Sequence, residues 1–190
     1  QKYSLRSDSK FTLRLRLRVY NLELEMYRDR RDLKKGTLLS AEVEEFMKGR
    51  EAVLPADYRL MLQYQSASSS FSAKDHSEAL RRVNEIINNN YGPVRVELQC
   101  FARILNLMIH FELGNIIVLR YAIDSARRFL KKNKRFGEFE KQALTVMSRL
   151  AKAGKNEMKE VFREGIDDFE KIGRETRDWV SDHLEWRSWL

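Results

Sequence analysis

Apolar residues in the middle of the chain follow a helical spacing, and the pattern occurs twice. Each copy, within residues 66–133, consists of an apolar segment, a short polar break and a second apolar segment. Matching residues stand 40 positions apart: Phe71 and Phe111, Asp75 and Asn115, Val83 and Ile123, Ile86 and Ala126. Apolar residues at intervals of three and four mark one face of a helix, so each copy predicts a helical hairpin. Two hairpins in tandem indicate a repeat architecture.

The N-terminal apolar stretch, residues 11–28, is compatible with two structures. Phe11, Leu13 and Leu15 alternate with polar residues, which is typical of a strand. The alternation slips in the middle of the stretch, whereas a helix accommodates all of it, with apolar residues on two opposite sides. We therefore favour a helix packed between neighbours. One of its two apolar sides is then expected to belong to a contact with chain upstream of Gln1.

Breaks in the pattern divide the chain into four hairpins. Turns are expected at about residues 32–36, 74–75, 114–115 and 154–155, where glycine, Asp or Asn can end one helix or cap the next. The expected hairpins cover roughly residues 11–50, 55–90, 94–133 and 136–172, followed by a capping helix at 174–190 that carries Trp179, Trp186 and Trp189. The serines Ser68, Ser69 and Ser70 lie in phase with apolar neighbours, so we expect a close helix contact there rather than a linker. The sequence thus predicts one all-α domain over residues 1–190.

The two clearest turns share a further pattern. Lys74-Asp75-His76 is followed at helical spacing by Ala79, Val83 and Ile86, and Gly114-Asn115-Ile116 by Leu119, Ile123 and Ala126. In these positions the chain resembles tetratricopeptide repeats (TPR), in a degenerate, long-helix variant of the kind found at the C-terminus of bacterial proteins. The period near 40 exceeds the 34 residues of that family, Leu119 stands in place of its alanine, Lys74 in place of its glycine, and its start-of-repeat signature is missing. The resemblance implies a right-handed α-solenoid of antiparallel helix pairs, whose concave face binds a peptide or protein segment and which brings no catalytic residues.

Composition fits a folded, soluble protein. The chain is 43% hydrophobic and 34% charged, unlike a disordered chain. No apolar run approaches the roughly 20 residues of a membrane span. The single cysteine, Cys100, lies in an apolar helical segment and is expected to be a buried, unreactive thiol. This cysteine usage suits a reducing compartment, so we expect a cytoplasmic location.

Basic residues supply the candidate interaction site. The net charge is +8, and residues 120–155 carry 11 basic against 3 acidic side chains. The densest group, the basic cluster, ends an expected helix and consists of Arg127, Arg128, Lys131, Lys132, Lys134 and Arg135. Cations at this position interact favourably with the negative end of the helix, which is the interpretation we favour. Binding of an acidic partner peptide and binding of nucleic acid are the two alternatives.

The sequence contains no evident pattern of catalytic or metal-binding residues. His76, His110 and His183 are far apart in the sequence and belong to no metal-ligand motif, and His76 fits a packing role at its turn. Neighbouring carboxylates such as Glu44 and Glu45 diverge on a helix and indicate a solvated acidic face. We therefore predict a non-catalytic protein–protein interaction or scaffold module without metal or cofactor. The alternative is a helical repeat that binds nucleic acid through its basic sections.

Overall fold

The structure of the protein is a computed structural model that describes residues 10–176 and 189. Over these residues the chain forms eight α-helices and no strand, which confirms the all-α prediction. The helices are α1 (Lys10–Asp29), α2 (Leu33–Met47), α3 (Ala56–Ser72), α4 (His76–Asn88), α5 (Val96–Glu112), α6 (Ile116–Lys132), α7 (Glu138–Leu150) and α8 (Met158–Thr176). None of the described helices is long and apolar enough to cross a membrane.

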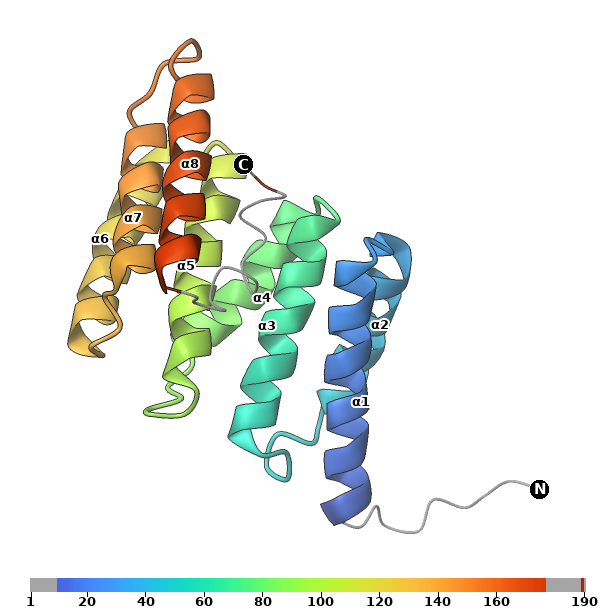
Figure 1. The fold of residues 1–190 in the computed structure, drawn as a ribbon. Helices are drawn as coiled ribbons and strands as arrows, with labels where there is room; N and C mark the ends of the chain where they lie inside the picture. Colours follow the sequence, from blue (N-terminus) through green and yellow to red (C-terminus); the bar gives the residue numbers. More distant parts are fainter. Residues whose placement is uncertain (1–9, 177–188, 190) are drawn as a thin grey trace.

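The helices pack in a regular order along the chain (Figure 1). Each odd-numbered helix contacts the next odd-numbered helix, and each of α2, α4 and α6 contacts the helices immediately before and after it. A large apolar core extends from α3 to α8, and a smaller one lies among α1, α2 and α3. Helix α3 serves both cores, because Leu60 and Tyr64 belong to the large one and Leu62 to the small one.

The ambiguous N-terminal stretch is helix α1, as favoured from the sequence. Leu17, Tyr20 and Leu24 on one side are buried in the small core. On the other side, Phe11 and Leu22 are exposed. The second apolar side therefore has no covering helix among the described residues.

The turn between α1 and α2 differs from the prediction. It falls at residues 30–32, where Arg31 is left-handed (φ 54°) and Asp32 caps α2 by accepting a hydrogen bond from the Lys35 N–H. Gly36, which was expected to mark the turn, lies inside α2 and is buried. Its nearest neighbours are Ser69 of α3 and Tyr27 of α1, at ordinary van der Waals distances from a Cβ built at this position.

The next two turns lie where they were predicted. Lys74 and Gly114 are left-handed, with φ of 61° and 70°. Asp75 caps α4 through a hydrogen bond from the Glu78 N–H to its carboxylate. The fourth expected turn, at residues 154–155, falls in the loop between α7 and α8, residues 151–157, which contains Gly154. The serines of α3 are buried at the contact between helices, which confirms that they do not form a linker.

The C-terminal boundary also differs from the prediction. A break between residues 172 and 174 is absent, because α8 continues through Gly173 to Thr176. A single glycine in a helix costs only about 1 kcal/mol, which the packing of α8 against α7 can offset. Trp179, Trp186 and most of the expected capping helix lie outside the described residues. Trp189 is described and packs against the large core.

Candidate functional site

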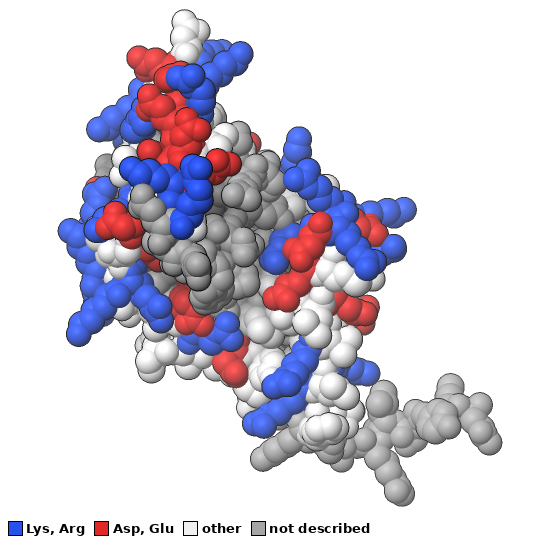
Figure 2. Space-filling view, in the orientation of Figure 1, with Lys and Arg blue, Asp and Glu red and all other residues white. Residues whose placement is uncertain are grey.

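The basic cluster lies on the surface at the end of α6 and in the turn to α7. Figure 2 shows Lys and Arg side chains along the edge of the molecule that α6 occupies in Figure 1. Two members have local partners: Arg127 pairs with Asp124 at 2.9 Å, and the Lys131 ammonium lies 5.4 Å from the centre of the Phe136 ring. The other four are exposed and form no side-chain ion pair with a described residue: Arg128, Lys132, Lys134 and Arg135. The cluster is thus available to a partner.

The exposed face of α6 continues from the basic cluster toward its N-terminus with apolar residues. Ile117 and Tyr121 are 73% and 74% exposed. They share a helix face with Arg128 and Lys132, because the intervals of 4, 7 and 4 residues each return close to the same side. Sequence reasoning missed this face, although its spacing is visible in the sequence.

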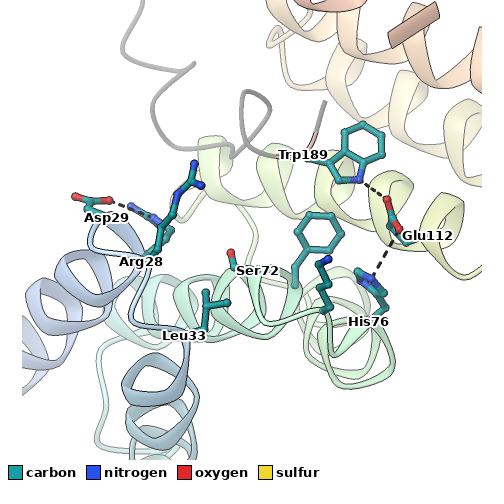
Figure 3. A pocket seen from close by; sticks show the side chains of 10 residues that line it. Arg28, Asp29, Leu33, Ser72, His76, Glu112 and Trp189 are labelled. Atoms are coloured by element: carbon teal, nitrogen blue, oxygen red, sulfur yellow. Dashed lines mark hydrogen bonds and ion pairs between the residues drawn. The ribbon is translucent and has the colours of Figure 1, made fainter. Parts of the chain in front are cut away.

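A cavity of about 550 Å³ lies at another edge, where the C-terminal ends of α1, α3 and α5 meet (Figure 3). Because α5 and α6 form an antiparallel hairpin, the basic cluster is at the opposite edge. The lining residues are Arg28, Asp29, Arg31, Leu33, Phe71, Ser72, Lys74, His76, Glu112 and Trp189. Helices α2, α4 and α6 begin at this same edge, so opposite helix dipoles meet there and the charged side chains set the local potential.

One wall of the cavity is held by a partly buried hydrogen-bond chain. The Arg28 side chain is only 8% exposed and donates to Gln65 Oε1 at 2.7 Å. The Gln65 amide donates in turn to Glu25 Oε1 at 2.9 Å, and Asn21 donates to the same oxygen at 3.1 Å. These bonds fix the guanidinium on two helices, so it needs little further ordering to meet a ligand.

The opposite wall is centred on Glu112 at the end of α5 (Figure 3). Its carboxylate accepts a hydrogen bond from Trp189 Nε1 at 2.6 Å and lies 3.8 Å from His76 Nε2. The Trp189 ring meets Phe111 and Phe162 edge to face, at centroid distances of 5.8 and 5.6 Å. An indole that combines apolar contacts with a hydrogen-bonded N–H is firmly seated.

Among the residues singled out from the sequence, His76, His110 and Cys100 take packing positions, and His183 lies outside the described residues. The His76 ring lies 5.3 Å from the Phe71 ring, as its expected packing role requires. His110 is buried, and burial lowers its pKa, so the imidazole is neutral at pH 7. Cys100 is buried as predicted, and burial raises the pKa of its thiol to about 12. Over residues 10–176 and 189, no group of His, Cys, Asp and Glu is arranged to hold a metal ion.

Sequence reasoning did not find the cavity, because it joins helix ends about 40 residues apart. One signal was present: a basic residue stands in each of the turns that follow α1 and α3, Arg31 and Lys74, and both are left-handed. Comparisons with protein-family models, with curated proteins and with solved structures found no match to this chain. The function is therefore inferred from the residues of the cavity and of the exposed face of α6.

Proposed function

We propose that the chain is a non-catalytic protein-interaction module that binds an acidic segment of a partner protein. The observation that carries the proposal is the cavity at the ends of α1, α3 and α5. There Arg28, Arg31 and Lys74 outnumber the acidic side chains, and the partly exposed ring of Trp189 supplies apolar surface beside the buried ring of Phe71. Cations beside aromatic surface suit a segment with carboxylates and at least one apolar side chain.

The proposal includes a TPR-like right-handed solenoid as the architecture. The order of helix contacts and the left-handed residues 31, 74 and 114, at intervals of 43 and 40, support a repeat with one hairpin per unit. In such an array the ends of successive odd-numbered helices line up at one edge. A partner segment that follows this edge would meet corresponding side chains from successive hairpins.

The expected binding is sensitive to salt. Arg31 is exposed and Lys74 lies at a turn on the surface, so their attraction for carboxylates is screened at physiological ionic strength. Arg28, by contrast, is held in a partly buried network by Gln65 and by an ion pair with Asp29 (Nε to Oδ1, 3.6 Å), and is expected to contribute a directional hydrogen bond.

A peptide-binding measurement tests the proposal. Fluorescence anisotropy would compare acidic peptides that contain one aromatic or aliphatic residue with the same peptides carrying Asn and Gln in place of Asp and Glu. We expect binding of the acidic set only, weakened at least about tenfold by Arg31→Glu with Lys74→Glu. Lys131→Glu with Lys132→Glu is the matched control, with the same change in charge at the opposite edge.

The results of the peptide-binding measurement distinguish the proposed cavity site from the basic cluster. Equal binding of the acidic and amide peptides, or no binding of either, would refute the proposal. Loss of binding only in the Lys131 and Lys132 variant would move the site to the basic cluster. In both variants, unchanged circular dichroism is required before a loss is interpreted.

Nucleic-acid binding is the second candidate function, and the exposed face of α6 favours it. Arg128 and Lys132 share that face with Tyr121, a ring on which a base could stack. Single-stranded RNA and duplex DNA should then bind at 20 mM salt, with an affinity that falls steeply as salt rises. Absence of binding at low salt would eliminate this candidate.

A further inference from the structure

Helix α1 carries an apolar stripe along the side that faces away from the two apolar cores. Phe11, Leu15, Val19 and Leu22 are between 43% and 75% exposed, and Met26 continues the stripe half-buried. Their intervals of 4, 4, 3 and 4 residues keep them on one helix face over roughly 22 Å. An exposed apolar stripe of this length on a soluble domain indicates an interface.

The stripe corresponds to a packing face found elsewhere in the fold. The left-handed turn residues Arg31 and Lys74 stand at equivalent points of two hairpins, 43 positions apart. The same interval relates Leu15, Val19 and Leu22 of α1 to Tyr58, Leu62 and Gln65 of α3. Tyr58 and Leu62 pack into the small core, and Gln65 bonds to α1. The stripe thus occupies the positions through which α3 packs on the preceding hairpin.

The stripe is nearly symmetric along the helix. Read from either end, its spacing pairs Phe11 with Met26 and Leu15 with Leu22, and the midpoint falls between Arg18 and Val19. Two identical stripes can therefore match when their helices run antiparallel. A twofold axis through the centre would generate this self-complementary contact.

Charges on both borders of the stripe obey the same symmetry. Arg16 and Glu23 lie on one border, with the arginine in the N-terminal half and the glutamate in the C-terminal half; Arg16 is exposed, and its guanidinium lies 5.2 Å from the centre of the Phe46 ring. Arg14 and Glu25 stand in the same order on the other border, where the Glu25 carboxylate also accepts hydrogen bonds from Gln65 and Asn21. In an antiparallel twofold pair each border meets the same border of the partner helix. Arg16 would then face Glu23 of the other copy, which favours this orientation over a parallel one.

Arg18, near the centre of the stripe, does not oppose this pairing. Its Nε donates to the Tyr58 hydroxyl at 3.1 Å, which draws the guanidinium toward α3 and away from the centre of the stripe. From these observations we infer that α1 is a homodimerisation surface, on which a second copy of this chain docks through its own α1 in antiparallel orientation. The stripe does not include the cavity-lining residues Arg28 and Asp29 at the end of α1, and the inference does not depend on the proposed peptide binding.

Sedimentation equilibrium of the full chain over about 1–100 µM tests the inference. We expect a monomer–dimer equilibrium whose dissociation constant rises at least about tenfold in Leu15→Glu with Leu22→Glu. Both residues are exposed, so the helical circular dichroism should be retained. Ile117→Glu with Tyr121→Glu, at positions on α6 that are more exposed still, is the matched control and should dimerise like the original chain.

A charge exchange tests the orientation. Arg16→Glu alone and Glu23→Arg alone should each weaken the dimer, because each creates like charges across the interface. The double variant, Arg16→Glu with Glu23→Arg, should restore it, because the exchanged pair is again complementary. A monomer throughout the concentration range, a dimer that survives the Leu15 and Leu22 changes, or a double variant no better than the single ones would overturn the inference.

Discussion

Replacing Gly36 with alanine is expected to stabilise the fold, although Gly36 is buried between helices. The residue lies inside α2 and its neighbours are set back: a Cβ built there would lie 3.8 Å from Ser69 Oγ and 3.8 Å from Tyr27 Cβ. These are ordinary van der Waals distances. One methyl group therefore fits without displacing α3.

The magnitude follows from helix propensity. Glycine in a helix interior is about 0.8–1.0 kcal/mol less favourable than alanine, partly because it leaves the unfolded chain more freedom. We expect Gly36→Ala to raise the free energy of unfolding by about 0.5–1 kcal/mol, or the Tm by about 1–4 °C for a chain of this size. Gly36→Leu should instead lower it by about 1–3 kcal/mol, because the larger side chain must displace Ser69.

Gly114→Ala is the matched control and should have the opposite sign. No heavy atom lies within 4 Å of a Cβ built at Gly114, but its φ of 70° is left-handed, which costs a residue with a Cβ roughly 1–2 kcal/mol. Urea denaturation followed by circular dichroism measures all three variants. A loss of more than about 1 kcal/mol in Gly36→Ala would mean that α2 and α3 are closer than these distances, and would refute the reasoning.

Three further predictions concern burial and ionisation. Ala79 is fully buried, so Ala79→Leu should destabilise the fold by about 1–3 kcal/mol in the same denaturation assay, and an unchanged midpoint would contradict its position. Cys100, with its pKa raised to about 12 by burial, should react with Ellman's reagent at pH 8 only after urea unfolds the chain; prompt reaction of the native protein would be inconsistent with this. A hydrogen bond from Arg81 holds the pKa of Glu78 below its ordinary 4.5, so this stabilisation exists above pH 4.5 and is lost as the pH falls through the folded-state pKa. Glu78→Gln should therefore flatten the fall in Tm below pH 4.5, and an identical pH profile would refute this role.

Helical periodicity was sufficient to predict the hairpins, because it depends on local spacing. The turns at Asp75 and Asn115 were predictable since a left-handed residue and a capping position follow one another directly in the sequence. Gly36 was misplaced for a physical reason: a glycine can end a helix or lie inside one, and here the packing of α2 against α1 and α3 keeps it inside the helix. At Gly173 the helical packing of α8 prevails over the weak break.

The cavity was less predictable than the basic cluster. Arg128 and Lys132 stand close together in the sequence, so their charge density is visible without a fold. Arg28, Lys74 and Glu112 meet only because three hairpins align their turns at one edge. The hydrogen bond between Trp189 and Glu112 joins residues 77 positions apart, and no local sequence pattern predicts it.

Helices α1 and α3 show that helical spacing predicts an apolar contact face but does not predict which surface covers it. Leu62 of α3 is fully buried, whereas Val19, 43 positions earlier, is 43% exposed. Both residues lie on an apolar face at helical spacing, so local sequence predicts a contact in each case. The difference arises from the neighbour, because α1 and α2 cover the face of α3, while no described helix covers the stripe on α1. The charges that flank the stripe then indicate what covers it. On α1 the order of Arg16 and Glu23 makes a second copy of α1, in antiparallel orientation, complementary in charge.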